Sequence, residues 1–353
     1  MAETNLDLFV PGRVCLFGEH SDWAGGYRTT DPAITRGYAI LTGTAQGIRA
    51  GVRRHPDQLI LHAPVPRCVN PQVYAIPMEP AALLAEAQSG GFASYVAGVA
   101  YQISLRYAVG GLFIENQFMD LPMRKGLSSS AAACVLAARA FNRLYSLGLS
   151  IREEMELAYL GERTTPSRCG RLDQGCAYGR RPVLMVFDGE GLEVEEIRIP
   201  RDLHLVIVDL AATKDTREIL RALNACYPVA PDERGRAVQE YLGPINADLV
   251  ARARAAMEAG DAEKIGRLMT EAQQAFDEHV APACPGELTA PVLHRVLDFE
   301  PLRPYVLGGK GVGSQGDGAA QFVVRDATGQ RTVIGIAQEG LGMRGVGLTI
   351  PAG

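Results

Sequence analysis

Residues 11–26 read PGRVCLFGEHSDWAGG, a strand-like segment that is unusually rich in polar groups. Arg13, Glu19, His20 and Asp22 stand in it together with Trp23, the only tryptophan of the chain. Charged side chains are rarely buried unless they are paired. The segment therefore raises the question of what these side chains bind, and the rest of the sequence supplies the answer.

The bulk composition indicates a two-domain globular protein with small partners. A chain of 353 residues exceeds the size at which one hydrophobic core usually stops growing. Hydrophobic residues make up 47% and charged residues 21%, which excludes a disordered chain. The net charge of −5 and the lack of basic runs predict neither nucleic acid nor an anionic membrane surface as a partner.

The sequence shows no membrane or secretion signal. No segment reaches the ~20 apolar residues of a membrane span, and the first residues, MAETNLDLFV, do not resemble a secretory signal. We therefore expect a cytoplasmic protein without a membrane partner. Seven cysteines without metal-type spacing predict reduced thiols. The oligomeric state is not indicated.

Hydrophobic periodicity divides the chain into a β-rich opening third and a mixed remainder. Strands are expected at 5–18, 38–54, 58–65, 110–118, 203–210, 319–324 and 331–336, with a hairpin around 188–191. Helices are expected as a pair within 80–106 and at 129–147, 151–163, 216–226, 233–258, 261–279 and 288–298. A soft boundary near residue 197 gives two predicted domains, 1–197 and 198–353.

The segment PMRKGLSSSAAA, residues 122–133, predicts an anion site. A glycine and three serines precede an alanine-rich helix, whose N-terminus offers unpaired N–H groups and the positive end of the helix dipole. A simpler alternative is that Ser128 or Ser129 only caps the helix. Capping leaves Gly126 and the flanking Arg124 and Lys125 unexplained, so we favour phosphate binding.

Two further segments add chemistry. GERTTPSRCGRLDQGCAYG, residues 161–179, supplies the carboxylates Glu162 and Asp173 among several arginines. A phosphoryl transferase needs one carboxylate for magnesium, another at the attacking hydroxyl, and a guanidinium nearby; ordinary surface salt bridges are the alternative. The glycine-rich segment GGKGVGSQGDG, residues 308–318, suggests close approach of backbone to a ligand, or a hairpin.

Taken in order, PGRVCLFGEHSDWAGG, GLSSSAA, CGRLDQGCAYG and the late glycine segment resemble the motifs of the GHMP kinase family, and most closely its galactokinase branch. The resemblance spans residues 11–318. It implies an α+β fold with an N-terminal domain of ribosomal-protein-S5 type, a C-terminal ferredoxin-like domain, and an active site in the cleft between them. It also implies an ATP-dependent phosphotransferase that acts on an alcohol group, with ATP, Mg²⁺ and a sugar as its small-molecule partners.

The resemblance also implies roles for single residues. Asp173 matches the catalytic aspartate and Arg13 its partner, while Glu19, His20 and Asp22 match positions that bind sugar hydroxyls. The phosphate-binding residues by the same match are Lys125, Gly126, Leu127, Ser128, Ser129, Ser130 and Ala131. Ser130 and Glu162 match the magnesium ligands, although Glu162 stands 11 residues before Asp173, about one fewer than in galactokinases.

Departures from the galactokinase pattern leave the sugar open. Arg171 replaces an apolar residue and, with Arg168, suggests pairing with the carboxylate of a uronic acid. Trp23 either stacks on a sugar or fills the core between the two domains. Arg124 either embraces nucleotide phosphates or is solvated, and Asp317 either contacts substrate or occupies a turn. The predicted function is phosphorylation of a monosaccharide. The predicted acceptor is the anomeric hydroxyl of galactose, a related sugar or a uronic acid. The alternatives are a kinase of a non-sugar alcohol such as mevalonate and a non-catalytic sugar sensor.

Overall fold

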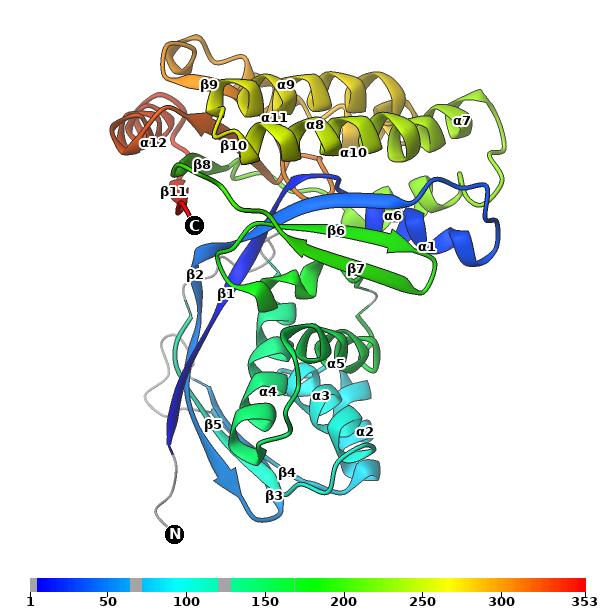
Figure 1. Ribbon diagram of the computed structural model, residues 1–353, viewed down its shortest axis with the longest axis vertical. Helices are drawn as coiled ribbons and strands as arrows, with labels where there is room; N and C mark the ends of the chain where they lie inside the picture. The colour runs from blue at the N-terminus through cyan, green and yellow to red at the C-terminus, as the bar shows by residue number, and fades with distance from the viewer. Residues whose placement is uncertain (1–4, 64–71, 120–127, 168) are drawn as a thin grey trace. The chain divides into compact units, whose positions relative to one another are not determined.

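The computed structural model describes residues 5–63, 72–119, 128–167 and 169–353 (Figure 1). It divides the chain into two compact units: unit 1 comprises residues 1–13 and 43–179, and unit 2 comprises residues 14–42 and 180–353. The strands β1 (Leu6–Phe17) and β2 (Gly37–His55) each contribute residues to both units. The single boundary near residue 197 that the sequence suggests stays a prediction.

Unit 1 is a sheet with helices on one side (Figure 1). Four of its strands follow the order β4-β3-β5-β2, where β3 runs parallel to β5 and the other pairs are antiparallel. Strand β1 also pairs with β2. The strands are β3 (Gln58–Ala63), β4 (Gln72–Pro77) and β5 (Gly111–Met119), besides β2. The helices are α2 (Pro80–Ser89), α3 (Ser94–Ser104), α4 (Ser129–Tyr145) and α5 (Ile151–Arg163), followed by the 3₁₀ turn η2 (Asp173–Tyr178).

Small residues let the helices of unit 1 pack closely. Helix α4 buries Cys134, Phe141 and five alanines, namely Ala131, Ala132, Ala137, Ala138 and Ala140. Helices α3 and α5 approach each other at Gly98 and Gly161, where a Cβ on Gly98 would lie 2.2 Å from the Gly161 carbonyl oxygen. Ser150 starts α5 with a capping box that it forms with Glu153.

Unit 2 contains an antiparallel sheet of order β11-β8-β10-β9. Its strands are β8 (Leu203–Asp209), β9 (Val306–Gly311), β10 (Ala319–Val324) and β11 (Gly345–Ile350). The helices of the unit are α1 (Ser21–Gly26), α6 (Thr216–Asn224), α7 (Glu233–Glu240), α8 (Asn246–Glu258), α9 (Ala262–His279), α10 (Pro285–Leu288), α11 (Pro291–Leu297) and α12 (Ala327–Leu341). Residues 37–41 of β2 pair with β6 (Val183–Asp188), which forms the predicted hairpin with β7 (Gly191–Glu196).

The segment after β1 belongs to the core of unit 2. Ala24 is buried with Ile219, Leu223 and other side chains from α6 to α10, and Trp23, Tyr27 and Ile34 pack against this cluster. Asn246, at the start of α8, donates to the Ser21 hydroxyl and to the Tyr38 carbonyl oxygen. Ser21 and Tyr38 are therefore held by Asn246, which comes 225 and 208 positions later in the chain.

Two expected elements differ in the structure. The predicted strand 331–336 is wrong, because these residues form part of α12, whose buried residues Gln330, Val333 and Ala337 recur at helical spacing. The predicted single helix 233–258 is α7 and α8 joined by a π-helical turn, Tyr241–Ile245. Gly243 leaves helical geometry there, and Pro244 has no N–H to donate.

Most other expected elements are confirmed, including the start of α4 at Ser129 and the bounds of α5. The six cysteines in the described part of the chain are free thiols. Within the same part, no helix is both long and apolar enough to cross a membrane.

Candidate active site

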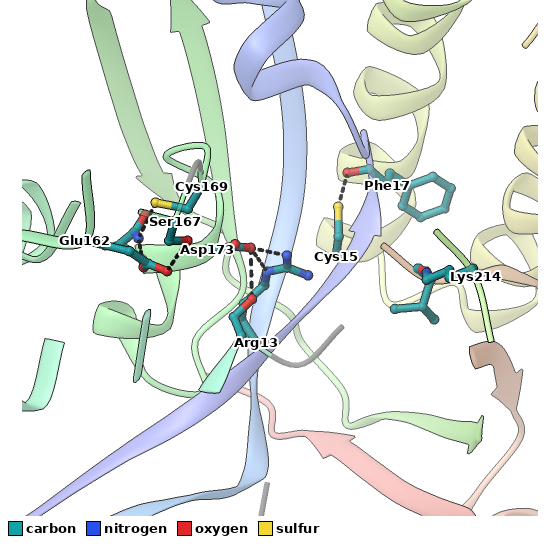
Figure 2. Close-up of polar contacts among 11 residues, drawn as sticks. Arg13, Cys15, Phe17, Glu162, Ser167, Cys169, Asp173 and Lys214 are labelled. Carbon is teal, nitrogen blue, oxygen red and sulfur yellow. Dashed lines mark hydrogen bonds and ion pairs between the residues drawn. The ribbon is translucent and has the colours of Figure 1, made fainter. Parts of the chain in front are cut away.

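Asp173 lies at the centre of a polar cluster in unit 1. Arg13, near the middle of β1, donates to Asp173 Oδ1 from Nε at 3.0 Å and also from Nη2 (Figure 2). The Ser128 hydroxyl donates to the same oxygen at 2.8 Å. Among the described residues, every donor to the Asp173 side chain reaches Oδ1. The pairing of Asp173 with Arg13, which stand 160 positions apart, agrees with the predicted partnership.

Ser128 precedes α4 in a left-handed conformation with φ of 54°. Its side chain makes no capping hydrogen bond, since it is directed to Asp173 instead. Ser129 and Ser130 form the first turn of α4, and Ala131 is buried behind them. The predicted phosphate-binding residues Lys125, Gly126 and Leu127 lie outside the described residues, as do Arg124 and Arg168.

Glu162, near the end of α5, is almost completely buried, with 1% of its surface exposed. Its Oε2 accepts a hydrogen bond from Gln174 Nε2 at 2.7 Å, and Ser167 donates to Oε1 at 3.4 Å (Figure 2). Burial first, and then the negative charge of Asp173, raise the pKa of Glu162 to about 7, while a hydrogen bond from Ser130 opposes this rise. A carboxyl group with a pKa of about 7 is partly protonated near neutral pH and would release its proton when a cation binds.

The chemistry of these donors fits magnesium. Mg²⁺ prefers oxygen ligands, and proteins usually hold it with one or two carboxylates together with substrate phosphates and water. Glu162 and Ser130 supply a carboxylate and a hydroxyl that lie in contact. In the part of the chain that the structure describes, no set of three or more His, Cys, Asp or Glu side chains could hold a metal ion by itself.

Glu19 follows β1 in unit 2 and is also buried. Lys310 on β9 donates to Glu19 Oε1, and Gln315 Nε2 lies 3.4 Å from Oε2. Only 1% of Lys310 is exposed, and its ammonium also donates to the Gly311 carbonyl oxygen at 3.0 Å. The motifs of the sequence assign no role to Lys310, and the signal that marks it is a lysine within a run of glycines.

His20 and Trp23 contact each other at the start of α1. Trp23 Nε1 donates to His20 Nδ1 at 3.2 Å. Burial is the main cause that lowers the pKa of His20 to about 4, and the positive charges of Lys214 and Lys310 lower it further. A backbone contact with Ser314 opposes this change. Trp23 also meets Tyr27 and Tyr227 edge to face and packs against the core of unit 2.

The remaining predicted residues have structural partners. Arg171 donates to Glu156 at 3.1 Å and lies over the ring of Tyr159, so a substrate carboxylate would compete with Glu156 for it. Asp317 accepts a hydrogen bond from the backbone N–H of Leu293, which favours a local structural role over substrate contact. Asp22 lies half-buried in the first turn of α1.

Solved structures of small-molecule kinases share this fold. The structure of Lactococcus lactis galactokinase complexed with galactose matches with a TM-score of 0.73 at 19% identity, over 99% of this chain and 94% of that one. The structure of L. major mevalonate kinase in complex with R-mevalonate matches with a TM-score of 0.69 at 18% identity, over 99% and 97%. The fold is therefore the α+β fold of GHMP kinases, as predicted.

Sequence comparison agrees with the fold. Residues 94–180 match the family model of the GHMP kinases N terminal domain. The chain is therefore similar to GHMP kinases in the sequence of residues 94–180 and in its fold. It is also 28% identical, over 305 residues, to a galactokinase of Thermococcus kodakarensis, which covers 79% of this chain and 80% of that protein.

Proposed function

We propose that the protein is an ATP- and magnesium-dependent sugar kinase that phosphorylates a monosaccharide, at the anomeric hydroxyl of galactose, a related sugar or a uronic acid. The observation that carries the proposal is the cluster of Arg13, Ser128 and Asp173 beside the N-terminus of α4. The similarity to galactokinases supports a sugar as the acceptor.

Asp173 acts on the acceptor hydroxyl in this proposal. Arg13 and Ser128 bind Oδ1 and fix the carboxylate, so Oδ2 is the oxygen that accepts the hydroxyl proton. The hydroxyl oxygen then bonds to the terminal phosphorus of ATP as the bond to ADP breaks, and Arg13 stabilises the charge that develops on the attacking oxygen. The products are ADP and the sugar phosphate.

The first turn of α4 acts on the nucleotide. The backbone N–H groups at Ser129 and Ser130 and the helix dipole favour phosphate oxygens there. Glu162 and Ser130 would hold Mg²⁺, which offsets charge on the phosphates when it is bound. Glu19, His20 and Asp22 are proposed to contact the sugar, with Lys310 holding the Glu19 carboxylate in place.

The experiment is a coupled assay of ADP release with ATP and Mg²⁺ against galactose, arabinose, fucose, glucose, galacturonate, glucuronate, inositol and mevalonate. We expect turnover of one sugar, and a fall of about 10²- to 10⁴-fold in Asp173→Asn, because the variant loses its proton acceptor. Asp188→Asn is the matched control, since Asp188 also pairs with an arginine, Arg28, outside the proposed site.

The panel separates the alternatives. Turnover of mevalonate instead of a sugar would show that the acceptor is not a sugar. It would favour the alternative of a kinase that acts on a non-sugar alcohol. Sugar binding without turnover would favour the non-catalytic sensor. If uronates are turned over, Arg171→Ala tests the carboxylate hypothesis, because activity on neutral sugars should then survive while activity on uronates is lost.

A further inference from the structure

The imidazole of His20 is held on two sides in unit 2. Phe276 of α9 stacks on its face, with ring centroids 6.4 Å apart and an interplanar angle of 19°. Trp23 meets it edge to face at 5.9 Å and 71°. Only 7% of His20 is exposed. The ring therefore has one available orientation, and its neighbours determine which nitrogen carries the proton.

The hydrogen bond from Trp23 selects the tautomer. An indole N–H can only donate, so His20 Nδ1 must be the acceptor and cannot carry a proton. The neutral ring then carries its proton on Nε2. A ring turned by 180° would place a carbon atom opposite the indole N–H and lose this hydrogen bond.

Among the described residues, His20 Nε2 is buried and meets no acceptor in full hydrogen-bond geometry, although the backbone of Ser314 lies near the ring and acts on its pKa. A buried donor without an acceptor is costly, which is why such groups call for a ligand or a water as an explanation. His20 also adopts φ of 70°, a left-handed conformation that is uncommon outside glycine. Strain of this kind persists where the surrounding structure fixes a functional side chain.

We propose that Trp23 is a positioning residue that holds His20 as the Nε2–H tautomer and so presents a fixed hydrogen-bond donor to an oxygen of the sugar. The part concerning the sugar rests on the proposed function, whereas the part concerning the tautomer does not. In this proposal Trp23 does not contact the sugar itself. It acts through His20, the residue that makes the contact.

The tautomer is tested in the free protein by ¹⁵N NMR of labelled histidine. His20 is assigned from the signal that disappears in His20→Asn, a substitution that suits a left-handed backbone. We expect one tautomer, Nε2–H, in the unmodified protein. Because the chain has a single tryptophan, replacing tryptophan by its benzothiophene isostere during expression removes only this N–H and keeps the ring.

The isostere and Trp23→Phe should each give a mixture of His20 tautomers, while the control Tyr27→Phe, which removes a hydroxyl from the ring next to Trp23, should not. An unchanged Nε2–H tautomer in both Trp23 replacements would overturn the proposal. Either replacement suffices for the comparison if the other does not fold.

The second readout is the kinetics with galactose as the probe. Loss of a defined donor should raise KM about 2- to 10-fold while kcat changes less than twofold, since the contact is made equally before and during the reaction. A mixed tautomer with unchanged KM would overturn the role in binding. If the unmodified protein turns over no sugar, the proposed function fails, and the role of His20 in sugar binding fails with it. The NMR comparison then still decides for or against control of the His20 tautomer by Trp23.

Discussion

Glu19 and Lys310 form a buried ion pair in unit 2. The two side chains are almost fully buried and join the end of β1 to β9. Burying two charges is expensive, so such a pair is weak evidence for stability, but removing one member leaves the other charge without compensation. The pair therefore makes the structure around Glu19 depend on a residue 291 positions away.

Lys310→Met should be destabilising by about 3 to 5 kcal/mol because it leaves the Glu19 carboxylate buried without its cation. Urea unfolding followed by circular dichroism measures the effect. The double variant Lys310→Met with Glu19→Gln should recover part of the loss, since it removes the uncompensated charge. Equal stabilities of the single and double variants would show that the two side chains are not coupled.

His20 should make stability depend on pH. Its pKa falls from 6.5 to about 4 on folding, so the folded state resists a proton that the unfolded state accepts. The stabilising contribution is complete above pH 6.5 and is lost as the pH falls through about 4. When the pH falls from 7 to 4.5, the free energy of unfolding should decrease in both proteins. The decrease should be about 2 to 3 kcal/mol smaller in His20→Asn than in the unmodified protein.

This comparison is made by urea unfolding of both proteins at the two pH values. The groups that act on His20, namely Lys214, Lys310 and the backbone of Ser314, remain in the variant, so other titrations cancel between the two proteins. Parallel pH profiles would contradict the lowered pKa.

At the scale of elements, glycine decides how closely helices approach their neighbours. The contact of α3 with α5 at Gly98 leaves no room for a side chain. The same holds for Gly308 on β9, where a Cβ would lie 1.9 Å from the Gly266 carbonyl oxygen of α9. This second approach explains why position 308 is occupied by glycine.

Gly98→Ala should reduce the free energy of unfolding by about 1 to 3 kcal/mol, because the added methyl group forces α3 away from α5. Gly335→Ala is the matched control: Gly335 lies within α12 with nothing within 4 Å of the new Cβ. There alanine should raise stability by about 0.5 to 1 kcal/mol through its better helix propensity. Thermal unfolding of both variants tests the contrast, and a stabilised Gly98→Ala would refute it.

The elements that sequence reasoning missed have identifiable causes. Residues 331–336 contain the β-branched run TVIGI, which favours a strand, but the N-cap Asp326 and the C-cap Gly342 mark a helix on either side. Strands β9 and β11 contain glycines that weaken the strand pattern, and their pairing with β10 and β8 depends on residues far away in the chain. Local signals predicted α4 and α5 because each has its own start signal.

In the candidate site, too, some features are predicted by sequence motifs and others depend on tertiary contacts. The motifs of residues 11–26 and 161–179 predicted that Arg13 and Asp173 are partners, and the structure brings them together. The bond from Ser128 to Asp173 could not be predicted, because it depends on the left-handed backbone before α4. The partners of Arg171 and Asp317 are likewise fixed by tertiary contacts that no motif records.

At the scale of the whole molecule, the two compact units are each assembled from separate stretches of the chain. Unit 2 needs residues 14–42 as well as 180–353, because Ala24 is part of its core and Glu19 compensates Lys310. The predicted boundary near residue 197 therefore has a testable consequence for fragments of the chain.

A fragment of residues 198–353 should not unfold cooperatively, since it lacks Trp23, Ala24 and Tyr27 from its core and leaves Lys310 buried without Glu19. Calorimetry and the dispersion of NMR signals measure this. Adding residues 14–42 through a linker, with residues 180–197 restored, should recover a transition. A sharp transition in the short fragment would show that 198–353 is a domain by itself.

The free thiols provide a last consequence. Cys134 and Cys176 in unit 1 and Cys226 and Cys284 in unit 2 are buried, and burial raises the pKa of each. A thiol reacts as its thiolate, so a disulfide reagent should modify these four only when the surrounding structure opens. Because the pairs belong to different units, the order in which they are labelled over time reports which unit opens first, without any substitution in the chain.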